Sequence, residues 1–94
     1  MQNNKKSTNA YMSIGEIAKK LNLINKKTGA LQTHTIRYWE TQFKQINPSI
    51  QAGKRRYYSQ KNLKTIRLIK SLLKDRGMTI KGVKRIFDNP KLHS

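Results

Sequence analysis

The chain of 94 residues contains no cysteine, which excludes disulfide bonds and thiolate metal sites and allows a reducing compartment. It has only two histidines, His34 and His93, which lie far apart and have no ligand-like neighbours. Its four acidic residues show no close pairing, and no nucleophile–base arrangement or glycine-rich phosphate loop appears. The sequence therefore predicts no catalytic site, no metal and no cofactor.

Long apolar runs are missing as well. None approaches the ~20 residues that a membrane span needs, so no membrane partner is expected. The polar segment 1–10 is not followed by the apolar stretch of a secretory signal, and a cytoplasmic location is expected. We predict one domain over residues 11–88, with a flexible N-terminal tail at 1–10 and a C-terminal tail at 89–94.

Positive charge is what the chain has in excess. Lys and Arg number 21 against four acidic residues, which gives a formal net charge of +17. A compact chain with this charge repels itself, so a polyanionic partner is the natural interpretation. The alternative is a solvated basic surface that reflects a lysine-rich composition.

Local signals predict two helices in the first half of the domain. Ser13 and the glutamate three residues later fit a capping box, and the helix that they start is expected to end near Asn22. A polar loop over residues 25–29 follows. The second helix is predicted over residues 33–44, with Thr33 as its N-cap to within one residue.

The second helix has two unlike faces. Ile36, Trp39 and Phe43 mark the apolar face, and the lone Trp39 is favoured as a packing anchor. Glu40 is expected to orient a neighbour or to cap a loop. The opposite face is polar, basic and aromatic, which suits a duplex groove, and it carries Thr33, His34, Arg37, Tyr38 and Thr41.

A β-hairpin is predicted over residues 50–58, with its turn at Ala52-Gly53. Cations interleaved with aromatics at a hairpin tip favour a wing that neutralises DNA phosphates, and a merely soluble turn is the alternative. The tip and second strand carry three consecutive cations and two aromatics, Lys54, Arg55, Arg56, Tyr57 and Tyr58.

Two more helices complete the predicted order. Ser59 and Thr79 are expected to cap them, and Gly77 is expected at the C′ position that ends the first of the two. The order helix, turn, helix, hairpin, helix, helix predicts a mainly α fold with a small β-hairpin wing. A winged helix-turn-helix with about four helices is the simplest such architecture.

Several stretches in this order resemble the N-terminal DNA-binding domain of the MerR family of bacterial transcription regulators. Ile-Gly-Glu-Ile-Ala-Lys at 14–19 is similar to the opening helix, and Thr-Ile-Arg-Tyr-Trp-Glu at 35–40 is similar to the recognition helix. Arg-Arg-Tyr-Tyr-Ser at 55–59, followed by Leu63, is similar to the wing. Thr-Ile-Lys-Gly-Val at 79–83 resembles the fourth helix of one branch of the family.

The resemblance implies roles for matching positions. It places Arg37 and Tyr38 at the major groove, and Arg56 on the backbone or minor groove. Tyr58 would either brace the wing or touch phosphate, and Lys70 would approach the backbone. The implied partner is double-stranded DNA at a pseudo-palindromic promoter, bound by a homodimer that forms through a region beyond this sequence.

Some alternatives stay open. Arg37 as a surface residue paired with Glu40, and Tyr38 packed against the wing, are the plainer roles for those two side chains. For His34, a direct DNA contact and plain exposure to solvent both stay open. An excisionase-type architectural DNA-binding protein shares a similar small winged fold, and an RNA-binding protein would suit the charge, although no RNA-recognition motif is visible. Finally, the connection over residues 25–31 is longer than the family's tight turn and is a candidate for a contact of its own.

Overall fold

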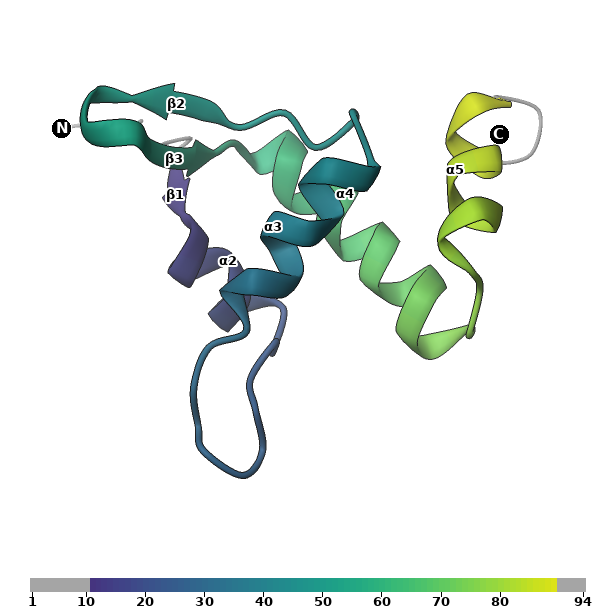
Figure 1. Ribbon diagram of the computed structural model, residues 1–94, viewed down its shortest axis with the longest axis horizontal. Helices are drawn as coiled ribbons and strands as arrows, with labels where there is room; N and C mark the ends of the chain where they lie inside the picture. The colour runs from purple at the N-terminus through teal and green to yellow at the C-terminus, as the bar shows by residue number, and fades with distance from the viewer. Residues whose placement is uncertain (1–10, 90–94) are drawn as a thin grey trace, which may run out of the picture.

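The computed structural model describes residues 11–89, which form four α-helices and a small three-stranded antiparallel sheet (Figure 1). This architecture confirms the predicted winged helix-turn-helix fold. The predicted tails fall outside the described residues, apart from Asn89. In chain order the elements are β1 Met12–Ser13, α2 Ile14–Lys20, α3 Thr33–Gln42, β2 Ser49–Gln51, η1 Ala52–Lys54, β3 Arg55–Tyr58, α4 Gln60–Lys70, η2 Ser71–Asp75 and α5 Ile80–Asp88.

The sheet joins the start of the domain to the wing. Its strand order is β1-β3-β2, with Met12 opposite Tyr58 and Ser49 opposite Tyr57. The hairpin β2–β3 was predicted, whereas β1 was not. Its two residues have no periodic signal, because the strand exists only through its pairing with β3.

Capping side chains start three of the helices. The Ser13 hydroxyl accepts from the Glu16 amide while the Glu16 carboxylate accepts from the Ser13 amide, which confirms the predicted capping box. Ser59 exchanges the same pair of bonds with Asn62 at the start of α4. The Thr79 hydroxyl caps α5. Each of these three helix starts is therefore fixed by residues three apart in the chain.

The helix α3 begins within the predicted margin of one residue, but it ends earlier than predicted. Its N-cap is Gln32, one residue before Thr33, and no side chain caps it. The helix ends at Gln42 rather than near Lys44, because Phe43 takes an extended backbone conformation. Phe43 is buried, so its packing in the core takes precedence over one more helical turn.

One apolar cluster fills the space between α2, α3, α4 and the sheet. Trp39 is only 4% exposed, which confirms the predicted packing anchor of α3. On the outer side, α5 packs the ring of Phe87 edge-on against Phe43, with 5.9 Å between ring centroids. The buried apolar residues are Met12, Ile17, Ala18, Leu21, Leu23, Ile36, Trp39, Phe43, Ile46, Tyr58, Leu63, Ile66, Ile69 and Val83.

The helix α4 continues into a single π-helical turn, η2, before the chain reverses toward α5. The amide of Arg76 donates to the carbonyl of Ser71 at 3.0 Å. Gly77 follows with φ of 68°, the left-handed conformation expected of a C′ residue. None of the helices in the part of the chain described is long and apolar enough to cross a bilayer.

Candidate nucleic-acid interface

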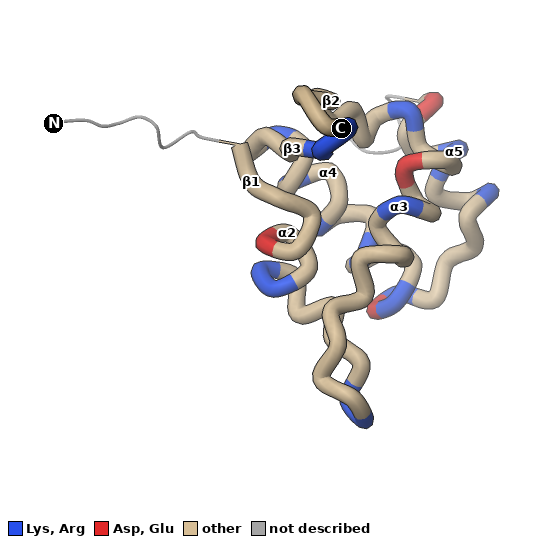
Figure 2. Tube along the Cα trace, turned by 60° about the vertical axis from the view of Figure 1, so that its left-hand side comes forward, with Lys and Arg blue, Asp and Glu red and all other residues tan. Residues whose placement is uncertain are grey.

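Basic residues occur on the helices, on the wing and at the tip of the loop between α2 and α3, whereas acidic residues are sparse (Figure 2). Charge density alone therefore does not locate an interface. The arrangement of particular side chains on α3 and β3 is more informative.

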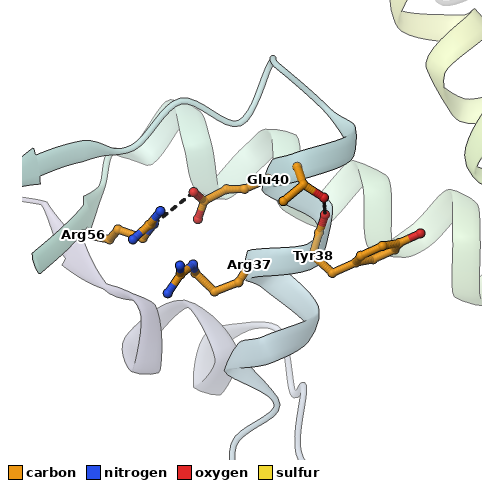
Figure 3. Close-up of a pocket in the computed structure, with 5 residues that line it drawn as sticks. Arg37, Tyr38, Glu40 and Arg56 are labelled. Atoms are coloured by element: carbon orange, nitrogen blue, oxygen red, sulfur yellow. Dashed lines mark hydrogen bonds and ion pairs between the residues drawn. The ribbon is translucent and has the colours of Figure 1, made fainter. Parts of the chain in front are cut away.

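Glu40 lies where α3 passes the wing. One of its carboxylate oxygens accepts from Arg56 Nε at 3.0 Å (Figure 3), and the other accepts from the Tyr58 hydroxyl. The Glu40 side chain is only 11% exposed, so both bonds are largely shielded from water. Because successive residues of a strand point to opposite faces, Arg56 and Tyr58 share the face of β3 that meets α3. Glu40 thereby fixes the wing to α3.

Tyr58 is fully buried, with 0% of its surface exposed. Burial raises the pKa of its phenol, and the hydrogen bond to Glu40 raises this pKa further, against a smaller opposite effect from the charges of Arg56 and Arg37. The phenol is therefore a neutral donor. Of the two predicted roles, bracing the wing fits this geometry, while the predicted phosphate contact is wrong because the hydroxyl is enclosed and already engaged.

Arg37 is exposed and extends from α3 toward the same side as Arg56 (Figure 3). The plainer role, a surface pair with Glu40, does not occur: both oxygens of Glu40 are taken by residues of β3. Within residues 11–89, Arg37 has no ion pair and no side-chain hydrogen bond. Its guanidinium is therefore available to a ligand.

An open hollow of about 330 Å³ lies between α3 and the wing and is lined by Arg37, Tyr38, Glu40, Thr41 and Arg56. Tyr38 is 53% exposed, and its ring points away from Arg56 (Figure 3), so the alternative in which it packs against the wing is wrong. Nearer the start of α3, His34 is exposed and Thr33 is half-buried.

The three consecutive cations of the wing do not form one surface. Lys54 is exposed at the turn with φ of 60°, directly after Gly53 with φ of 76°. Arg55 borders a separate cavity together with Tyr57 and Tyr11, on the other side of the strand from Arg56. The wing thus presents Arg56 toward α3, Arg55 away from it and Lys54 at the tip.

Lys70 is half-buried on α4 and does not line the hollow of Arg37 and Arg56. It borders a different cavity, opposite the loop between α2 and α3. Lys26, Lys27 and Lys74 line that cavity as well, and sequence reasoning did not group them. Their positive charge was visible in the sequence, but their convergence depends on how the loop folds.

An exposed arginine on the second helix of a helix-turn-helix, beside a hairpin fixed by that helix, defines a winged helix-turn-helix DNA-binding domain. A family model described as "MerR HTH family regulatory protein" matches residues 12–90. The chain therefore belongs to the MerR HTH family and is a DNA-binding domain of a transcription regulator. Comparison with curated proteins gave no match, and comparison with solved structures gave none either.

Proposed function

We propose that this domain binds duplex DNA with α3 in the major groove and the wing on the backbone or minor groove. The observation that carries the proposal is the double hydrogen bond of Glu40 to Arg56 and Tyr58. It makes α3 and the wing one rigid unit, so that Arg37 and Arg56 face the same side (Figure 3). A preorganised surface of this kind avoids the entropic cost of ordering the wing on binding.

Arg37 is the residue that we propose reads a base. Its planar guanidinium can form two parallel hydrogen bonds to the O6 and N7 acceptors of guanine. Tyr38 and His34, both exposed, are proposed to contact phosphate through their polar tips, with Thr33 beside them at the start of α3. These side chains all belong to the polar face of α3 that the sequence predicted.

The wing is proposed to position the domain without reading sequence. Glu40 holds Arg56 through Nε, which leaves the two terminal nitrogens of the guanidinium for phosphate oxygens. Lys54 and Arg55 add exposed charges at the tip and on the outer side. Contacts of this class contribute affinity at every sequence and fix the register.

Selection of bound sequences from random duplexes is the test, followed by titrations with the selected site. Arg37→Ala is expected to weaken binding to that site by about 1–3 kcal/mol and binding to random duplex by much less. Arg56→Ala is expected to weaken both alike. Arg85→Ala, which removes an exposed arginine from α5, is the control and should change neither by a comparable amount.

Three results would contradict the proposal in different ways. Equal losses from Arg37→Ala on both duplexes would make Arg37 a phosphate contact. A loss from Arg56→Ala on the selected site alone would contradict the wing assignment. Stronger binding to RNA of equal length would overturn the DNA interface as a whole. The symmetry of the selected sites tests whether this domain pairs on DNA by itself, because a dimer binds half-sites about one helical turn apart.

A further inference from the structure

The loop between α2 and α3 has its own internal order. The side-chain oxygen of Asn25 accepts from the amides of Lys27 at 2.9 Å and Thr28 at 3.1 Å. The backbone of Asn25 pairs with Ala30, and Gly29 provides the left-handed conformation with φ of 77° that turns the chain back. The loop therefore holds its tip in a defined shape.

The root of the loop is attached to the core. Ile24 and Leu31 form an antiparallel bridge, and the amide of Gln32 donates to the carbonyl of Leu23 at 2.8 Å. Leu23 itself is buried in the apolar cluster. The loop thus resembles a small second hairpin that projects from the N-terminal end of α3 (Figure 1).

Positive charge gathers on both sides of one cavity at this loop. The cavity measures about 650 Å³ and has Lys26 and Lys27 on the loop, with Lys70 and Lys74 on the opposite side. Asp75 is the only acidic residue that lines it. Within the part of the chain that the structure describes, none of these lysines forms an ion pair. Their mutual repulsion is a cost that an anionic partner would relieve.

The loop and the wing lie at opposite ends of the interface. Figures 1 and 2 are related by a rotation about the vertical axis, and in both the loop is at the bottom and the wing at the top. The helix α3 runs between them, with the loop at its N-terminal end and Glu40 near its C-terminal end. A duplex that receives α3 in a groove has phosphate strands on both sides of that helix.

We infer that the loop acts as a second wing, which grips the DNA backbone between Lys26 and Lys27 on one side and Lys70 and Lys74 on the other. This inference rests on the proposed function. A strand that carries one phosphate every ~3.4 Å can engage lysines from both sides at once. The cavity is open and does not enclose a small anion, which favours the extended polyanion.

The test compares two charge-matched variants. Lys26→Gln/Lys27→Gln removes two charges from the loop, and Lys81→Gln/Lys84→Gln removes two exposed charges from α5. The loop variant is expected to make the negative slope of log affinity against log salt shallower by about 0.9 for each phosphate that it no longer neutralises, on selected and random duplexes alike. The α5 variant is expected to keep the wild-type slope. Thermal unfolding of both variants establishes that they fold.

Ethylation interference locates the contact. Ethylated phosphates on the side of α3 away from the hairpin wing are expected to impair the wild type, and this effect should vanish in Lys26→Gln/Lys27→Gln. Lys70→Gln/Lys74→Gln should abolish interference at the same phosphates. Unchanged slope and unchanged interference in the loop variant would overturn the second wing.

Failure of this inference is distinguishable from failure of the proposed function. If Arg37→Ala abolishes site preference while the loop variant matches the α5 control, only the second wing is overturned. If the wild type does not bind duplex DNA, both are overturned. If inorganic phosphate stabilises the wild type but not the loop variant, while both have the same salt slope on DNA, the cavity is a small-anion site and the second wing is overturned as well.

Discussion

Glu40 joins two elements through a single carboxylate, and its substitution is expected to affect stability and DNA binding together. Glu40→Ala leaves the buried Tyr58 hydroxyl without its acceptor, and an unsatisfied buried donor costs about 1–3 kcal/mol. Glu40→Gln keeps an acceptor and should destabilise less. Urea unfolding measures both. The affinity for DNA should fall on selected and random duplexes alike, because the wing loses its fixed position.

The control for Glu40 is Asp88→Asn, which raises the net charge by the same amount at an exposed position on α5. Removal of an acidic residue strengthens binding to a polyanion nonspecifically, and this control measures that contribution. If Glu40→Ala were as stable as the control and bound DNA as tightly, Glu40 would not be the residue that fixes the wing.

The buried phenol of Tyr58 predicts a loss of stability in alkali. Burial and the bond to Glu40 raise its pKa in the folded state above the ordinary tyrosine value of ~10. A group whose pKa is higher in the folded state stabilises fully below its unfolded pKa, and this stabilisation is lost as the pH rises above that value. The free energy of unfolding should therefore fall above pH ~10 more steeply than in Tyr58→Phe.

Phenolate absorbance measures the same group directly. The difference between the wild type and Tyr58→Phe isolates the ionisation of Tyr58. This ionisation should accompany the loss of folded structure rather than precede it, since the neutral phenol is the form that the fold encloses. Ionisation at the ordinary pKa in the folded protein would contradict the burial of Tyr58.

At the scale of elements, local signals were sufficient for the order of the four helices, but insufficient for the end of α3 and for the contacts between elements. The capping boxes at Ser13 and Ser59 involve partners three residues apart, so the sequence reveals them. The bonds from Glu40 to Arg56 and Tyr58 span 16 and 18 residues, and the sequence indicated only that Glu40 orients a neighbour. Strand β1 was not predicted either, because it forms only by pairing with β3, which is distant in the sequence.

The basic run of the wing shows what the alternation of side chains along a strand adds to a prediction from composition. Alternation along β3 separates Arg55 from Arg56, although the two are adjacent in a basic run. Treated as one run, these cations appeared to form one phosphate-binding surface. Which of the two faces meets α3 depends on the register of the sheet, and this register is fixed by pairs such as Ser49 with Tyr57.

The start of α4 gives a prediction on the stability of an element. Ser59→Ala removes the hydroxyl that accepts from the amide of Asn62, a residue only 6% exposed, and should cost about 1 kcal/mol. Thr65→Ala removes a hydroxyl from the middle of the same helix, where alanine has the higher helix propensity, and should be neutral or slightly stabilising. Equal effects of the two substitutions on the midpoint of thermal unfolding would show that the cap does not stabilise α4.

At the scale of the whole molecule, the charge of +17 sets two opposite responses to salt. The repulsion between like charges is stronger in the compact state than in the expanded unfolded chain, so it lowers the stability of the fold. Salt screens this repulsion, because the Debye length falls from ~30 Å at 0.01 M to ~10 Å at 0.1 M. The same salt weakens DNA binding, because the release of counterions on association becomes less favourable.

The free protein should therefore unfold at a higher temperature as sodium chloride increases over this range, while the affinity for duplex DNA falls. With DNA present the response of stability to salt should reverse. Duplex at a hundred times its dissociation constant stabilises the fold by ~2.7 kcal/mol, and this contribution shrinks as salt weakens binding. Thermal unfolding with and without duplex, measured over one salt series, tests both signs. If salt instead lowered the stability of the free protein, repulsion between surface charges would not be what limits this stability. Internal ion pairs such as Glu40 with Arg56, which salt weakens, would then outweigh the repulsion.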